Sequence, residues 1–126
     1  MVGIVSYAGN ILLVRKRNDS SGYLAGMWHI PGETLEDGED DEAVLKRGIR
    51  EEAGIEIKVF AHIGNMRTPH KNTLVNWYFC DAVTFTLQSG SDVNDARWVA
   101  REEVAALCSE KGKALWPREA KLYFSF

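Results

Sequence analysis

Two neighbouring carboxylates, Glu51 and Glu52, are the residues whose types and spacing most directly indicate chemistry. They fall in a run of helix-forming residues from position 39 to position 53, which Gly54 closes as a C-terminal stop. At about 100° per residue, one stripe of this helix is apolar and faces a core. The stripe consists of Leu45, Ile49 and Ala53. Glu51 and Glu52 lie beside it, in a wedge about 100° wide that also contains position 48.

A hard divalent cation is the ligand that this pair of carboxylates accommodates best. Two like charges at the border of a buried face repel each other, and partial burial disfavours their ionised forms. Mg²⁺ relieves both effects, because it takes carboxylate oxygens, keeps several waters and recruits substrate phosphates. The alternative is a solvated helix face on which Lys46 and Arg47 pair with the glutamates, and that is the usual role of a Glu-Glu pair taken alone.

The residues around the pair match a longer pattern. Residues 32–39 (GETLEDGE) and 47–55 (RGIREEAGI), separated by seven residues, resemble the Nudix box, G-x5-E-x7-R-E-U-x-E-E-x-G-U, in which U is a bulky aliphatic residue. The preceding residues 28–32 (WHIPG) are similar to the lead-in W-x-[LF]-P-G. The matching positions of the box are Glu39, Arg47, Ile49, Glu51, Glu52, Gly54 and Ile55.

The resemblance implies a role for each matching polar residue. Glu51 and Glu52 correspond to metal-binding glutamates, and the carbonyl of Gly32 corresponds to a further ligand of Mg²⁺, for which Mn²⁺ can substitute. Glu39 corresponds to the residue that pairs with Arg47 and fixes the loop against the helix, so both join the expected catalytic residues. The metal neutralises phosphate charge and helps to generate or place the attacking hydroxide.

Two positions depart from the box. Glu33 stands where the box has a glycine, and Gly48 stands where it has the first glutamate of R-E-U-x-E-E. In the family that glutamate binds metal or assists the base, and a positioned general base contributes roughly 10²–10⁴-fold. Three explanations of Gly48 stay open: a bulkier element packs against it, a carboxylate such as Glu33 or Asp92 enters the vacated space, or the chain binds without hydrolysing.

Two further segments resemble parts of the family that contact substrate. Residues 116–119 (WPRE) are similar to the W-P-x-[DE] segment of the purine pocket in mammalian 8-oxo-dGTP hydrolases. This implies that Trp116 stacks on a purine and that Glu119 accepts a hydrogen bond from it. Asp92 and Asp95 lie near the place of a late metal ligand or base, and complete the expected substrate-binding residues. The alternatives are a core tryptophan on an amphipathic helix and a solvated acidic turn.

The remaining elements form the scaffold that must position these residues. Strands and helices interleave without a regular βαβ rhythm, which favours an α+β fold over a doubly wound sheet. The resemblance makes this expectation specific: a Nudix-type α/β/α sandwich with a mixed central sheet and a loop–helix–loop catalytic motif. The expected strands are Val2–Tyr7 and Ile11–Lys16 in a hairpin, Trp28–Pro31, Ile55–Ile63, Thr73–Leu87 and Arg97–Ala100, and the expected later helices are Arg101–Lys111 and Ala114–Phe124.

Size and charge limit the classes of protein to which the chain can belong. Its 126 residues fit one domain, 1–126, and a net charge of −3 without a basic run argues against binding of a nucleic-acid polymer. Cys80 and Cys108 are expected to be buried thiols in a reducing compartment. No signal peptide or membrane-spanning run is evident, so we expect a cytoplasmic protein without a membrane partner, as a monomer or homodimer.

These observations lead to ranked hypotheses for the function. The first is a Mg²⁺-dependent pyrophosphohydrolase that converts a nucleoside triphosphate, including an oxidised one, to a monophosphate and pyrophosphate. ADP-ribose or a dinucleotide is the rival substrate, since Pro69 follows Gly54 by 15 residues, as in members that cleave ADP-ribose. The second hypothesis is a catalytically weakened Nudix domain that binds or senses a nucleotide. The third is a plain interaction domain.

Overall fold

The chain folds around one mixed β-sheet with helices on both sides. The computed structural model describes residues 1–17, 24–33, 38–68, 73–90 and 93–126. The strands are β1 (Val2–Tyr7), β2 (Asn10–Lys16), β3 (Trp28–His29), β4 (Ile57–Arg67), β5 (Leu74–Ala82) and β6 (Val93–Ala100). The helices are α1 (Asp41–Ala53), the 3₁₀ helix η1 (Arg101–Glu103), α2 (Val104–Leu107), α3 (Glu110–Lys113) and α4 (Arg118–Tyr123).

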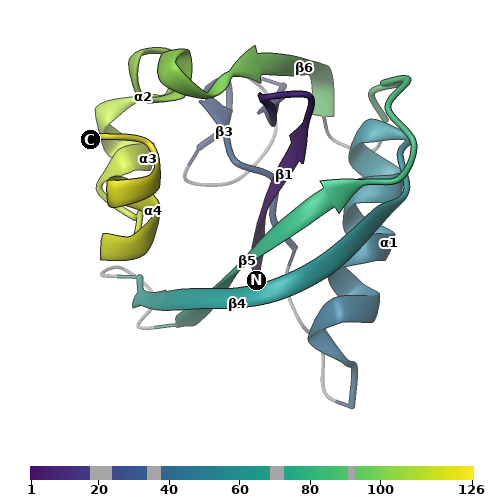
Figure 1. Ribbon diagram of the computed structural model, residues 1–126, viewed down its shortest axis with the longest axis horizontal. Coiled ribbons are helices and arrows are strands. Elements are labelled where there is room, and N and C mark those ends of the chain that lie inside the picture. Colours follow the sequence, from purple (N-terminus) through teal and green to yellow (C-terminus); the bar gives the residue numbers. More distant parts are fainter. Residues whose placement is uncertain (18–23, 34–37, 69–72, 91–92) are drawn as a thin grey trace.

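The sheet separates the long helix from the short ones. Its strand order is β3-β2-β1-β5-β4, with β6 paired to β2, and β1 and β5 run parallel while the other pairs are antiparallel. Figure 1 shows α1 on one side of the strands and α3 and α4 on the other. The expected α+β sandwich with a mixed central sheet is therefore confirmed.

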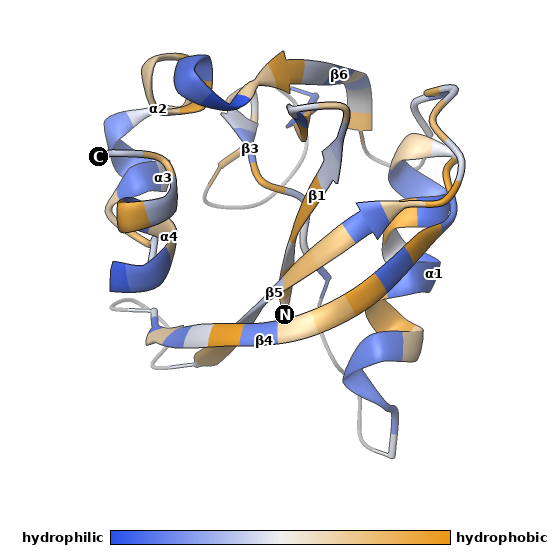
Figure 2. Ribbon diagram, viewed as in Figure 1, coloured by the Kyte–Doolittle hydropathy of each residue, from blue (hydrophilic) through white to orange (hydrophobic). Residues whose placement is uncertain are grey.

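Strand β2 supplies side chains to both layers of the core. Ile11 and Leu13 belong to the cluster that contains residues of α2 and α4, whereas Leu12 and Val14 belong to the cluster packed against α1. Successive side chains of a strand point to opposite faces, so a strand covered on both faces is apolar throughout. Figure 2 shows the corresponding pattern on α1, where hydrophobic and hydrophilic residues alternate because one stripe of the helix is buried.

Several element boundaries differ from those expected from the sequence. Strand β5 ends at Ala82 instead of Leu87, while β4 extends to Arg67 and β6 begins at Val93. The expected helix 101–111 is divided, because the Ser109 side chain accepts a hydrogen bond from the backbone N–H of Gly112 at 3.0 Å and starts a new helix. The last helix begins at Arg118, after Pro117 in an extended conformation.

Strand β4 lies at one end of the described strand order and has two irregularities. Its pairing with β5 shifts register between Val59 and Ala61 and again between His62 and Gly64. Phe60, within the first shift, is 56% exposed. Register shifts of this kind bend a strand and increase its local twist. Among the described residues, no helix is long and apolar enough to cross a membrane.

Candidate active site

Helix α1 is capped at both ends, which fixes the position of its last turn. The Asp40 carboxylate accepts a hydrogen bond from the N–H of Ala43 at 3.1 Å. At the other end, Gly54 adopts a left-handed conformation (φ 73°), and its N–H donates to the carbonyl of Arg50. The helix begins two residues later than position 39, since Asp40 is the cap. Its buried residues include Leu45, Ile49 and Ala53, as the sequence predicts.

Glu51 and Glu52, in the last turn of α1, have different surroundings. Glu52 is buried, with 6% of its surface exposed, and its Oε2 atom is inaccessible to solvent. The side chain of Glu51 is 55% exposed. A loop crosses the end of the helix beside them, where the N–H of Gly90 donates to the carbonyl of Glu52 at 3.2 Å. The last turn of α1 therefore carries one buried and one exposed carboxylate at consecutive positions, and the backbone at Gly90 is hydrogen-bonded to this turn.

Arg47 links the loop before the helix to the last turn of the helix. Its Nη1 atom donates to Oε2 of Glu39 at 2.8 Å, and its Nε atom lies 3.9 Å from Oε1 of Glu51. The hydrogen bond to Glu39 is the main cause that raises the pKa of Arg47, with smaller contributions from the charges of Glu51 and Glu33. The pairing of Glu39 with Arg47 is thus present. The charged guanidinium of Arg47 interacts with the carboxylates of Glu39, Glu51 and Glu33.

Residues 31–33 are paired with the start of β1. The N–H of Gly3 donates to the carbonyl of Pro31, and Val2 and Gly32 form an antiparallel bridge. A Cβ atom built on Gly32 would lie 2.9 Å from the carbonyl oxygen of Met1, so only glycine fits this contact. The segment that precedes the helix is therefore fixed against a strand of the sheet.

Gly48 is covered by the side chain of Glu33. A Cβ atom built on Gly48 would lie 2.9 Å from Oε2, 3.0 Å from Cβ and 3.1 Å from Cγ of Glu33. Of the carboxylates expected to enter the space above Gly48, Glu33 is there, whereas Asp92 lies outside the described residues. The two positions that depart from the Nudix box are thus in direct contact.

The donor atoms around α1 suit a hard divalent cation. Within the described parts of the chain, no three Asp, Glu, His or Cys side chains lie close enough to hold a metal ion by themselves. Mg²⁺ commonly uses one or two protein carboxylates and completes its coordination with waters and substrate phosphates. Glu51 and the buried Glu52 supply carboxylate oxygens, the donor type that Mg²⁺ takes.

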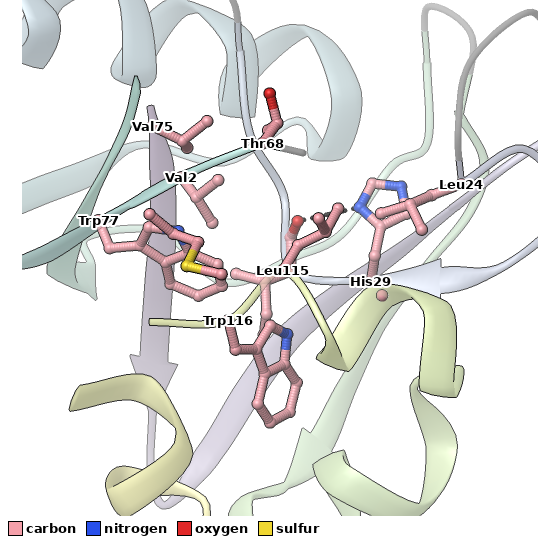
Figure 3. A pocket seen from close by; sticks show the side chains of 11 residues that line it. Val2, Leu24, His29, Thr68, Val75, Trp77, Leu115 and Trp116 are labelled. Carbon is pink, nitrogen blue, oxygen red and sulfur yellow. Dashed lines mark hydrogen bonds between the residues drawn. The ribbon is translucent and has the colours of Figure 1, made fainter. Parts of the chain in front are cut away.

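A largely apolar cavity of about 110 Å³ lies on the other face of the sheet. Figure 3 shows Trp77, Leu115 and Trp116 on one side of it and His29 on the other. Nδ1 of His29 lies 2.9 Å from the carbonyl oxygen of Ile30. A carbonyl only accepts, so Nδ1 donates, and Nε2 of the neutral ring is an acceptor. The cavity therefore combines apolar walls with one titratable ring.

Residues 29–33 connect the cavity with α1. His29 and Ile30 line the cavity, as does Val2, which pairs with Gly32, and the next residue, Glu33, lies on Gly48. The sequence predicts Trp116 as a substrate contact but gives no signal for the other lining residues, which come from distant segments. These include Leu24, Met66, Thr68, Val75 and Leu115.

The structure does not bring all the candidate substrate-binding residues together. Trp116 lines the cavity and is itself 3% exposed, within the core. Glu119, in the first turn of α4, is exposed, and its carboxylate would collide with a Cβ atom at position 64 of β4. Asp95 lies within β6, 3.8 Å from both Arg15 and Arg97, and not in an acidic turn before the strand as expected. Asp92 lies outside the described residues.

Comparisons with known proteins agree with this geometry. A family profile described as NUDIX domain matches residues 1–124. The NAD-capped RNA hydrolase NudC of Pseudomonas aeruginosa is 24% identical over 115 residues, which are 90% of this chain and 40% of that protein. The chain therefore spans less than half the length of this curated relative.

Solved structures of other proteins have the same fold. A NUDIX hydrolase from Nitrosomonas europaea has a TM-score of 0.78 at 16% identity, covering 95% of this chain and 68% of that one. An ADP-ribose pyrophosphatase from Streptococcus suis has a TM-score of 0.75 at 15% identity, covering 98% of this chain and 87% of that one. At these identities the likeness establishes the fold.

Proposed function

Because the chain belongs to the NUDIX domain family, we propose that it is a Mg²⁺-dependent pyrophosphohydrolase whose substrate is a nucleoside triphosphate. The observation that carries this proposal is the last turn of α1, where the buried Glu52 and the exposed Glu51 are neighbours. Mn²⁺ is the expected substitute metal. The match over residues 1–124 argues against a plain interaction domain with an accidental box.

The proposed reaction replaces a bond between two phosphates with a bond to water. One P–O bond of the triphosphate chain breaks, the oxygen of water forms the new P–O bond, and the products are a monophosphate and pyrophosphate. A bound Mg²⁺ supplies neutralisation of phosphate charge and acidifies a water. Glu51 and Glu52 would hold that cation with the carbonyl of Gly32. The ion pair between Glu39 and Arg47 would fix the position of the preceding loop relative to the helix.

The cavity is the proposed site of the nucleobase. Its walls are largely apolar, and Trp77 and Trp116 contribute aromatic side chains to them. From there, residues 29–33 lead to α1, so a base in the cavity would direct its phosphates toward Gly32 and the glutamates.

The test is hydrolysis of a substrate panel by the purified protein. The panel contains the common and oxidised nucleoside triphosphates, ADP-ribose and a dinucleotide, each with Mg²⁺, with Mn²⁺ and with a chelator. We expect metal-dependent release of monophosphate and pyrophosphate, and loss of activity in Glu52→Gln. The matched control is Glu42→Gln, which removes a carboxylate paired with Lys46 on the exposed face of the same helix. Equal activity of both variants would contradict the proposal.

Two rival functions give different results in the same panel. Preferential turnover of ADP-ribose or the dinucleotide would identify that substrate class. Binding without hydrolysis is favoured by one observation, the glycine at position 48 where the family carries a carboxylate. A raised Tm with nucleotide and metal, with no turnover of any compound, would support that rival, because a ligand of the native state stabilises it.

A further inference from the structure

The segment that follows β5 runs alongside the carboxyl end of α1. Figure 1 shows it beside that end of the helix. The N–H of Gln88 donates to the carbonyl of Ala53 at 2.9 Å, and the N–H of Gly90 donates to the carbonyl of Glu52 at 3.2 Å. The last four carbonyls of an α-helix have no partner within the helix. Residues 83–90, the clamp loop, therefore complete hydrogen bonds that the last turn of α1 cannot make by itself.

The clamp loop also holds the chain just beyond the helix. The N–H of Val83 donates to the carbonyl of Glu56 at 2.8 Å, and the N–H of Glu56 donates to Oγ1 of Thr84 at 2.8 Å. Between these contacts and the helix lies Gly54, on which a Cβ atom would be 3.1 Å from Cβ and from the carbonyl oxygen of Gln88. The loop thus contacts the main chain on both sides of the stop signal that ends α1.

Gly90 brings the backbone of the clamp loop against the backbone of the helix. A Cβ atom built on Gly90 would lie 2.7 Å from the carbonyl oxygen of Glu51, which is closer than real Cβ atoms approach. Gly90 does not have a positive φ, so the close approach, and not the backbone conformation, requires glycine here. The loop therefore touches the backbone of Glu51 and is hydrogen-bonded to that of Glu52.

Two contacts anchor the middle of the clamp loop to the sheet. The ring of Phe85 stacks on that of Tyr7, at the end of β1, with centroids 4.5 Å apart and an angle of 10° between the planes. Nε1 of Trp98, in β6, donates to the carbonyl of Phe85 at 3.0 Å. Because Phe85 is 52% exposed, its ring adds little to the core, and its main contact is the one that fixes the loop.

We propose that the clamp loop positions Glu51 and Glu52 for catalysis, with Phe85 and Gly90 as its positioning residues. This inference rests on the proposed function, in which the two glutamates act at the phosphates. A catalytic group that is displaced by about 1 Å can lower the rate by about 100-fold. The proposed base site lies on the other face of the sheet, so a loosened loop leaves binding of the base in place. The loop therefore acts on kcat and not on KM.

The test combines hydrogen exchange with steady-state kinetics. Phe85→Ala removes the stacking contact of an exposed side chain, and Gly90→Ala forces the loop away from the helix. We expect the backbone amides of residues 51–54, followed by NMR, to exchange about 10-fold faster, the equivalent of one lost hydrogen bond. On the nucleoside triphosphate that the wild type hydrolyses fastest, we expect kcat to fall about 10- to 100-fold and KM to stay unchanged.

Two control variants separate positioning from a general loss of stability. Phe60→Ala makes the same change at a side chain that is 56% exposed and stacks on Phe79, far from the clamp loop in sequence. Asp40→Ala weakens α1 at its opposite end, where the Asp40 carboxylate caps the helix. Both controls should keep the wild-type kcat and the wild-type exchange of residues 51–54. Phe85→Tyr, which keeps an aromatic ring over Tyr7, should restore both quantities.

Each contrary result has a distinct meaning. Wild-type exchange of residues 51–54 in both Phe85→Ala and Gly90→Ala would show that the loop does not hold the helix. Faster exchange with an unchanged kcat, or an equal fall of kcat in Phe60→Ala, would overturn the positioning role. A wild type that hydrolyses no compound of the panel would contradict the proposed function and with it the catalytic role, while the exchange rates would still decide whether the loop clamps the helix.

Discussion

Arg47 is the residue at which the loop and the helix of the candidate site meet. Arg50 lies on the same helix but pairs with a residue outside the site, so its substitution serves as a control. Arg47 contacts Glu39 and Glu51 through different nitrogens, whereas Arg50 forms a two-point ion pair with Glu56. Lysine has a single ammonium group and cannot maintain both contacts of Arg47. We expect Arg47→Lys to lower kcat/KM about 10- to 100-fold, and Arg50→Lys to leave it unchanged. Steady-state kinetics checks both, and equal rates for the two variants would contradict the bridging role.

Gly48 offers a test of packing that does not depend on activity. In the wild type, Gly48→Ala introduces a Cβ atom against the Glu33 side chain, so the better helix propensity of alanine is offset by crowding. In a Glu33→Gly background that crowding is absent. There we expect Gly48→Ala to stabilise the protein by about 1 kcal/mol, the difference between the two residues in a helix interior. Urea denaturation of the four proteins of this cycle measures the coupling, and an additive result would disprove the contact.

The sequence indicates the residues of α1 better than it indicates their partners. Helical periodicity predicts the buried stripe and the place of Glu51 and Glu52, because it depends only on local spacing. The contact between Glu33 and Gly48 could be stated only as one of three explanations, since it depends on how residues 31–33 pair with β1. Asp95 was expected in a turn for a similar reason: its ion pairs with Arg15 and Arg97 become visible only when β6 pairs with β2.

At the scale of the elements, the N-terminal cap of α1 is the contact most easily tested. The Asp40 carboxylate accepts the N–H of Ala43, which otherwise has no partner within the helix. We expect Asp40→Ala to lower the free energy of unfolding by about 1 kcal/mol, with Asp40→Asn close to the wild type because asparagine also caps helices. Chemical denaturation measures both variants. If alanine and asparagine gave the same loss, the effect would come from charge and not from the cap.

Local stop and start signals explain which elements were predicted correctly. Gly54 ends α1 where expected, because the left-handed conformation that closes the helix favours glycine. The prediction of one helix over 101–111 was wrong. Helix propensity does not reveal that Ser109 accepts a hydrogen bond from the N–H of Gly112 and so caps the start of a new helix, α3. The strand after residue 73 ends early for a different reason: Val83 and Phe85 are 62% and 52% exposed, so hydrophobic composition there does not reflect burial in the sheet.

At the scale of the whole molecule, burial of ionisable groups makes stability fall in alkaline solution. Burial raises the pKa of Cys80 to about 12 and that of Cys108 to about 11, from an ordinary value of 9.0. Because folding raises these pKa values, the stability that the neutral thiols confer is fully present below about pH 9 and is lost as pH rises toward the folded values. The loss is about 1.4 kcal/mol per pH unit for each thiol in that window. Urea midpoints at pH 8 and pH 10.5 measure it, and the double variant Cys80→Ala, Cys108→Ala should show a smaller decline.

The two register shifts in β4 have a consequence for how the molecule behaves at high concentration. An outermost strand of 11 residues that exposes a phenylalanine of its own, Phe60, would, if flat, be a template for the backbone of another chain. The shifts at Val59/Ala61 and His62/Gly64 interrupt the regular row of amides and carbonyls and curl the strand. An irregular outline of this kind is expected to discourage fibril growth, because adding a strand from another chain needs a flat and regular edge.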